Sequence, residues 1–156
     1  MIYGSLATAQ VEINSIEFKG VTKYKTSFLH QFIRTKRGDK LDSTILKSDI
    51  QDLLNLRGIT ECQFFVYSDS NKTTVTIEAS ENLTVIPIFN FGNIEDNQYF
   101  RLGAVDANFL GREIYLGGFY QYNSRHSVAL KNRIPFIKNN KWGALANITL
   151  WRDREP

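Results

Sequence analysis

The first half of the chain alternates between two hydrophobic periods. Apolar residues recur at every second position over 16–20, then at helical spacing over 25–34 and 42–54, and again at every second position over 61–67 and 75–79. A period of two is typical of strands, and a period near 3.6 is typical of amphipathic helices. The pattern therefore predicts an α+β unit with the order β-α-α-β-β.

The second predicted helix has clear boundary residues. Asp42 is a good N-cap, and Leu41 before it can pack against Leu46 as a hydrophobic staple. Gly58 follows the apolar stripe and is a typical stop signal. The stripe predicted to face the core is Leu46, Ile50, Leu53 and Leu54.

From residue 83 onward the helical period disappears. Alternating apolar and polar positions mark the segments 83–91, 99–108, 113–123, 126–137 and 142–152. Turn residues separate them at 92–93, 110–112, 123–125 and 139–141. An antiparallel meander of such strands is typical of a transmembrane β-barrel, but a soluble β-sandwich with one buried face gives the same alternation. The periodicity leaves both architectures open.

Composition and charge narrow the classes of function. Aromatic residues make up 13% of the chain, charged residues 22%, and the formal net charge is +3. No basic stripe predicts a nucleic-acid partner. A single cysteine, Cys62, excludes an internal disulfide. The small residues at 7–9 have the form of an export-signal cleavage site, so residues 1–10 are either a signal-peptide remnant or an ordinary N-terminal extension.

Candidate catalytic chemistry is weak. His30 and His126 have no Cys or His nearby at the spacing that metal ligands require. No phosphate-binding loop or nucleophile elbow stands out. We therefore expect neither an enzyme nor a cofactor.

Four stretches of the chain stand out in order: IEFKG at 16–20, KRGDKLD at 36–42, LLNLRGITECQFFV at 53–66 and NFLGRE at 108–113. With the first three, the β-α-α-β-β unit resembles a POTRA (polypeptide-transport-associated) domain. With the fourth, the second half resembles the first strands of the barrel in the outer-membrane β-barrel assembly superfamily, the bacterial surface antigens. The resemblance divides the chain into a POTRA-like domain at 11–82 and the N-terminal strands of a barrel at 83–156. Closed bacterial barrels have at least about eight strands, so we expect the barrel to be incomplete.

The resemblance implies a role in outer-membrane protein biogenesis. The POTRA-like domain would lie in the periplasm and bind extended client polypeptide, and a barrel in the bacterial outer membrane would insert or translocate it. The implied partners are an unfolded outer-membrane protein or secreted client, outer-membrane lipid and accessory assembly subunits. The alternative is a soluble peptide-binding or adhesion module with a β-sandwich and no membrane insertion.

Two candidate sites follow from the resemblance. The first is an open sheet edge, whose unpaired backbone groups can bind an extended peptide. Its residues are Glu61, Cys62, Gln63, Phe64, Phe65, Val66 and Tyr67, of which Phe65 and Tyr67 are expected to face outward. The second is a barrel hairpin motif in which the first and last residues flank a tight turn. It consists of Asn108, Phe109, Leu110, Gly111 and Arg112.

Overall fold

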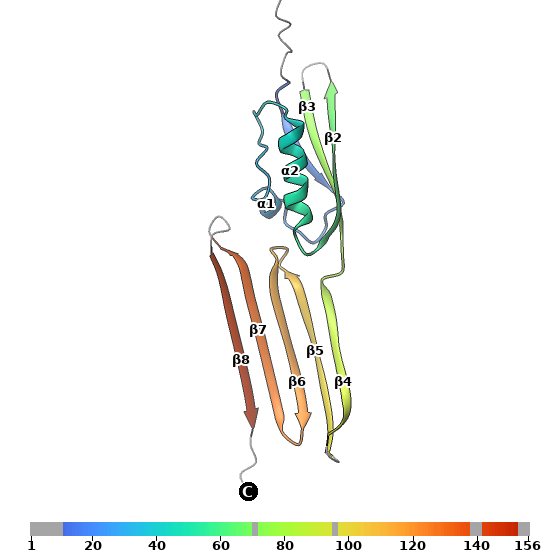
Figure 1. The fold of residues 1–156 in the computed structure, drawn as a ribbon, viewed down its shortest axis with the longest axis vertical. Helices are drawn as coiled ribbons and strands as arrows, with labels where there is room; N and C mark the ends of the chain where they lie inside the picture. Colours follow the sequence, from blue (N-terminus) through green and yellow to red (C-terminus); the bar gives the residue numbers. More distant parts are fainter. Residues whose placement is uncertain (1–10, 70–71, 95–96, 138–141, 153–156) are drawn as a thin grey trace, which may run out of the picture.

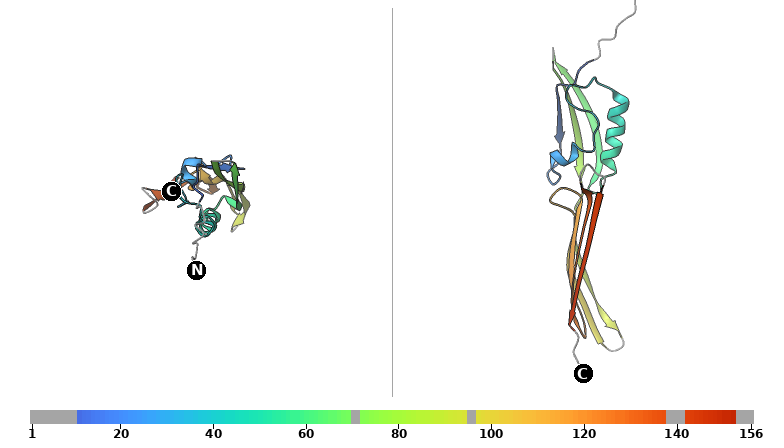
Figure 2. Two further views of the ribbon diagram at one scale, coloured as in Figure 1. Left: turned by 90° about the horizontal axis from the view of Figure 1, so that it is seen from above. Right: turned by 90° about the vertical axis from the view of Figure 1, so that its left-hand side faces the viewer.

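The computed structural model describes residues 11–69, 72–94, 97–137 and 142–152. It has two parts stacked end to end along the long axis (Figures 1 and 2). The first part contains β1 (Ser15–Lys19), α1 (Thr26–Leu29), α2 (Ser43–Leu54), β2 (Ile59–Asp69) and β3 (Lys72–Glu81). The second contains β4 (Val85–Ile94), β5 (Asn97–Phe109), β6 (Ile114–Asn123), β7 (His126–Ile137) and β8 (Trp142–Arg152). The predicted order β-α-α-β-β is confirmed, and so is the meander that follows it.

The first part is a three-stranded sheet with the order β1-β3-β2. β1 runs parallel to β3, and β2 runs antiparallel to it. α2 lies along one face of this sheet (Figure 2). The apolar side chains of both helices form the core with the strands. The buried apolar residues are Ile13, Tyr24, Phe28, Leu29, Ile33, Leu46, Ile50, Leu53, Leu56, Ile59, Val75, Ile77 and Ala79.

α2 begins as its sequence predicts. The Asp42 side chain accepts hydrogen bonds from the backbone N–H groups of Thr44 and Ile45, at 2.7 and 3.3 Å. These bonds satisfy donors that have no partner within the helix. The predicted stripe is buried at Leu46, Ile50 and Leu53, and α2 ends at Leu54.

The first helix is shorter than predicted. α1 spans only Thr26–Leu29, residues 30–32 form turns, and residues 33–35 have no regular structure. The segment that follows is bound by Asp49, which is fully buried in α2. Its carboxylate accepts the backbone N–H groups of Arg34 and Thr35, at 2.9 and 3.0 Å. A buried carboxylate needs such donors, and they hold this segment in an irregular conformation.

The second part is a five-stranded antiparallel sheet in sequence order, β4 to β8. Its two faces differ in chemistry. One face carries the apolar and aromatic side chains Val85, Phe89, Phe91, Phe100, Leu102, Leu116, Val128, Leu130, Ile148 and Leu150. The other, which we call the polar face, carries Asn90, Arg101, Gln121 and Lys131 together with apolar side chains such as Ile86, Phe119 and Trp151. The apolar face is exposed, with 83% of Phe91 and 67% of Leu150 accessible.

The turn predicted at 92–93 is wrong. Both residues lie within β4, which continues to Ile94. Gly92 pairs with Tyr99, and a Cβ atom at Gly92 would lie 2.9 Å from the tyrosine ring. The Tyr99 hydroxyl donates to the side-chain oxygen of Asn90 at 3.0 Å. The glycine thus gives space to a ring on the neighbouring strand and does not mark a turn.

No helix among the described residues has the length and apolar character needed to cross a membrane.

Candidate functional site

β2, which contains the predicted peptide-binding residues, is an outer strand of its sheet. The direction of its peptide groups follows from the central strand. Thr73 of β3 uses both its backbone N–H and its C=O toward Asn14, on the β1 side, at 2.6 and 2.8 Å. The backbone of Thr73 therefore makes no hydrogen bond to β2. Along an antiparallel ladder, hydrogen-bonded residue pairs alternate with pairs that are not hydrogen-bonded. By the register, the peptide groups of Cys62, Phe64 and Val66 face the open edge.

The side chains of this edge divide as the alternation predicts. Cys62 and Phe64 are half-buried and pack against the core, while Phe65 and Tyr67 are 38% and 56% exposed. The rings of Phe65 and Tyr67 lie 6.4 Å apart on the outward face. Val66 points inward opposite Val75 but is 37% exposed. The β2–β3 hairpin extends beyond the end of α2 (Figure 1).

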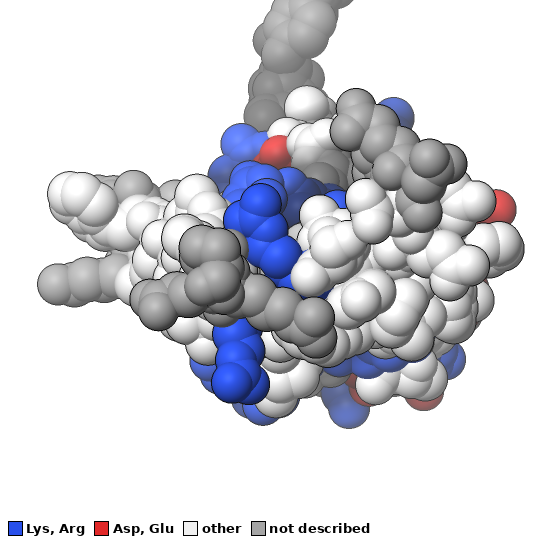
Figure 3. All heavy atoms as spheres, turned by 90° about the horizontal axis from the view of Figure 1, so that it is seen from below, with Lys and Arg blue, Asp and Glu red and all other residues white. Residues whose placement is uncertain are grey.

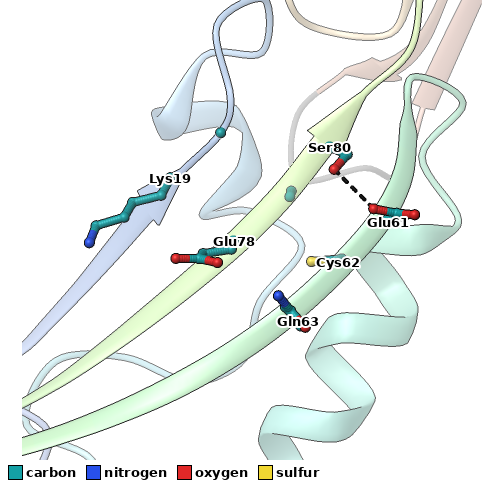
Figure 4. Close-up of a pocket in the computed structure, with 8 residues that line it drawn as sticks. Lys19, Glu61, Cys62, Gln63, Glu78 and Ser80 are labelled. Atoms are coloured by element: carbon teal, nitrogen blue, oxygen red, sulfur yellow. Dashed lines mark hydrogen bonds between the residues drawn. The ribbon is translucent and has the colours of Figure 1, made fainter.

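A hollow lies on the helix-free side of the same sheet. Lys19, Glu78 and Gln63 lie side by side on three strands, and Ser80 donates to the Glu61 carboxylate at 3.2 Å (Figure 4). The hollow encloses about 620 Å³. Cys62 also lines it, and burial raises the pKa of its thiol to about 11. The thiol is therefore protonated near neutral pH and is a poor nucleophile.

The predicted hairpin residues form the turn between β5 and β6. Leu110 and Gly111 have positive φ angles of 61° and 66°, and the Gly111 N–H donates to the Asn108 carbonyl at 2.9 Å. Phe109 and Leu110 are exposed, and Asn108 is buried. Arg112 is exposed at the rim of a hollow lined by Phe28 and Phe136 among others.

This turn docks onto the first part of the chain. The Gly111 carbonyl accepts the backbone N–H of Lys25 at 3.2 Å. A Cβ atom at Gly111 would lie 2.1 Å from the carbonyl oxygen of Lys23. Position 111 therefore requires glycine for two reasons, its φ angle and the close approach of another backbone.

Glu113, directly after the turn, is the residue that sequence reasoning missed. It is 3% exposed, and its carboxylate accepts the Tyr24 hydroxyl and the backbone N–H of Arg57, the latter at 3.0 Å. The Tyr24 oxygen also accepts the N–H of Gly58 at 2.9 Å. Burial and the bond to Glu113 raise the pKa of Tyr24 above its ordinary value. We call Tyr24, Arg57, Gly58 and Glu113 the junction cluster.

Glu81, at the end of β3, supports the loop that carries Tyr24. Its carboxylate accepts the backbone N–H groups of Thr22, Lys23 and Tyr24 at 2.8 to 2.9 Å, and also the Thr22 hydroxyl. Burial alone would raise the pKa of Glu81, but these donors together hold it below its ordinary value. The loop is thereby fixed against the point where the chain enters the second sheet.

An aromatic contact adds a further attachment. Phe136 of β7 packs edge-on against Phe32 with ring centroids 5.1 Å apart, and lies 6.1 Å from Phe28. The two sheets therefore meet through the covalent connection at 82–84, the docked turn and this aromatic group.

The described residues hold no group of three or more His, Cys, Asp or Glu side chains that could bind a metal ion.

Comparison with known proteins agrees with this architecture. Residues 11–82 match the POTRA family model, described as a surface antigen variable number repeat. The crystal structure of BamA from Haemophilus ducreyi lacking POTRA domains 1–3 superposes with a TM-score of 0.69 at 16% identity. The superposition covers 90% of this chain and 27% of that one. CdiB from Acinetobacter baumannii aligns with a TM-score of 0.43 at 17% identity, over 80% of this chain and 26% of that one. No curated protein sequence matches the chain.

These findings define the class of protein. The chain has a POTRA domain followed by a five-stranded antiparallel sheet with the fold of the corresponding part of BamA. Residues 11–82 belong to the POTRA family, and the chain spans about a quarter of the BamA chain it matches. The predicted resemblance is confirmed for the POTRA family and for the fold.

Proposed function

We propose that this chain is part of an outer-membrane assembly or transport protein, and that its POTRA domain binds extended client polypeptide along β2. The observation that carries the proposal is the open edge of β2. Peptide groups at Cys62, Phe64 and Val66 face away from the sheet, and Phe65 and Tyr67 are exposed beside them. An extended segment can add to such an edge through main-chain hydrogen bonds, with little dependence on its sequence.

The second sheet supports a location in the outer membrane, with the POTRA domain in the periplasm. Its exposed apolar face carries Phe89, Phe91, Leu130 and Leu150, while the opposite face combines polar and basic side chains with apolar ones such as Ile86 and Trp151. Barrel strands present this pattern to lipid and to an aqueous interior. The fold match with BamA supports the same reading. The soluble sandwich requires a second layer over the apolar face, and none of the described elements supplies one.

Val66→Pro tests the edge directly. The substitution removes an N–H that faces the open edge, so an alternating apolar and polar peptide should bind the full chain in detergent micelles about 2- to 10-fold more weakly, which corresponds to the loss of roughly one main-chain bond. Val66→Ala is the control, because it shortens the side chain and keeps the N–H. Equal binding by wild type and Val66→Pro would refute the edge as the site.

Labelling in liposomes tests the membrane assignment. Leu130 and Lys131 are neighbours on opposite faces of β7. In a Cys62→Ser background, a water-soluble maleimide should modify Lys131→Cys and leave Leu130→Cys protected by lipid. Equal modification of both cysteines would favour the soluble sandwich instead.

A further inference from the structure

The polar face of the second sheet carries an uncompensated positive charge. Arg101 pairs with Gln121, and on β7 Lys131 pairs with Gly117 and Arg133 with Tyr115, so all three cations lie on this face. The only carboxylate within the described parts of β4 to β8 is Asp106, and it pairs with Leu116 on the apolar face. Viewed from the end of this sheet, lysine and arginine side chains gather in a band (Figure 3).

The groups that hold these cations are neutral. Arg101 donates through Nε and Nη2 to the Gln121 side-chain oxygen, at 2.8 and 2.5 Å, and its guanidinium lies 4.4 Å from the Phe119 ring centroid. The Lys131 ammonium lies 5.7 Å from the Tyr115 ring centroid. Amide oxygens and aromatic rings orient a cation and leave its charge in place. The three cations form no ion pair with another described residue.

The cations lie on both sides of β6, with Arg133 and Lys131 on β7 and Arg101 on β5. Their register positions on β6 are Tyr115, Gly117 and Gln121, beginning at the end that docks onto the POTRA domain. At a rise of about 3.3 Å per residue, they are spaced by roughly 7 and 13 Å along the strand. We define Arg133, Lys131 and Arg101, in this order from the POTRA end, as the basic track.

We propose that the basic track binds the carboxylates of an acidic, extended segment of client polypeptide as it passes from the POTRA domain along the polar face. The inference rests on the proposed function, because it assumes a client. Residues two apart on an extended chain have side chains on one side at about 7 Å spacing, which matches Arg133 and Lys131. Charges of one sign gathered on both sides of β6 also raise the local concentration of an oppositely charged segment.

Two peptides and the full chain in zwitterionic detergent micelles test the proposal. One peptide has glutamate at every second position, and the other has glutamine in its place. At low salt, fluorescence anisotropy should show the glutamate peptide binding at least about 5-fold more tightly, and added salt should reduce this ratio because it screens exposed charges. The variant Lys131→Gln with Arg133→Gln should bind both peptides equally.

Arg152→Gln is the matched control, because it removes an exposed cation from the apolar face of β8, opposite His126. It should preserve the preference for glutamate. Far-UV circular dichroism checks that each variant keeps its strands. A preference that survives the double substitution, or falls equally in Arg152→Gln, overturns the proposal. So does a preference that phosphatidylglycerol in the micelles abolishes, because the cations then bind lipid phosphate.

The two proposals fail in different ways. If wild type binds both peptides equally, only the basic track is refuted. If it binds neither, the client-binding function fails as well. Val66→Pro should weaken both peptides by the same factor, since its effect is on the backbone and not on charge.

Discussion

The hydroxyl of Tyr24 donates a hydrogen bond to the carboxylate of Glu113, 89 residues further along the chain. The bond joins a loop of the POTRA domain to the first residue after the β5–β6 turn. Both groups are buried, and neither has bulk water to replace its partner. The contact between the two sheets therefore includes a directional hydrogen bond in addition to its apolar packing.

Tyr24→Phe should weaken the junction cluster. The substitution leaves the Gly58 N–H without its acceptor and removes a donor from Glu113. A buried group left unpaired costs about 1–3 kcal/mol. We expect hydrogen exchange at the Gly58 amide to accelerate roughly 5- to 150-fold, which corresponds to this range. Tyr67→Phe, at an exposed tyrosine, is the control. Unchanged exchange in Tyr24→Phe would contradict the role of the hydroxyl.

Gly111→Ala should separate the turn from the POTRA domain. Gly38 provides a matched comparison, since it has a positive φ of 89° but its nearest atom to a new Cβ lies 3.9 Å away. Both substitutions carry left-handed backbone strain of about 1–2 kcal/mol. Only Gly111→Ala adds the clash with Lys23. Spin labels at Gln63→Cys and Ser127→Cys, in a Cys62→Ser background, should therefore show a broadened distance distribution in Gly111→Ala alone. The same broadening in Gly38→Ala would point to strain as the cause.

Glu81 should make the stability of the chain depend on acid. Its folded pKa lies below the ordinary 4.5, so its contribution is present above about pH 4.5 and is lost as the pH falls through the folded value. Wild type should thus be more stable than Glu81→Gln at pH 7, and the difference should shrink as the pH falls to 3. Urea unfolding at each pH measures this. A difference that is constant with pH would show that the carboxylate charge has no part in holding the loop.

The two halves should behave differently when the chain is cut near Asn82. The buried core residues all lie between Ile13 and Ala79, so residues 11–82 should fold alone in water. Residues 83–156 keep an exposed apolar face and two outer strands, and such surfaces recruit other chains. We expect this fragment to aggregate in buffer and to dissolve only in detergent. A monomeric 83–156 fragment with cooperative unfolding in buffer would support the sandwich alternative.

Sequence periodicity predicted most of the fold because local preference and final burial agree. The apolar stripe of α2 and the alternation in β3 lie against the core as expected. The prediction failed for the helix over 25–34. Its apolar spacing is helical, but the backbone N–H groups of Arg34 and Thr35 donate to the distant Asp49 carboxylate. A tertiary hydrogen bond of this kind leaves no trace in the local pattern.

In the candidate sites too, the sequence did not show contacts between residues far apart in the chain. The sequence identified the β2 edge and the turn residues from their likeness to a family. It gave no signal for Glu113 or Tyr24, because a single acid and a single tyrosine far apart in the chain are common and show no spacing. Gly111 was expected to serve a turn, and the structure adds that it also admits the backbone of Lys23.

The contact between the sheets can be considered as a mechanical joint. The connection at 82–84 and the docked turn at Gly111 are two fixed points, and two fixed points leave a rigid body free to swivel about the line between them. The edge-on packing of Phe136, on β7 of the second sheet, against Phe32 is a third point that resists this swivel. Loss of that aromatic pair would leave the contacts at 82–84, Gly111 and Glu113 to hold the two parts together, so the β2 edge would move more freely relative to the second sheet.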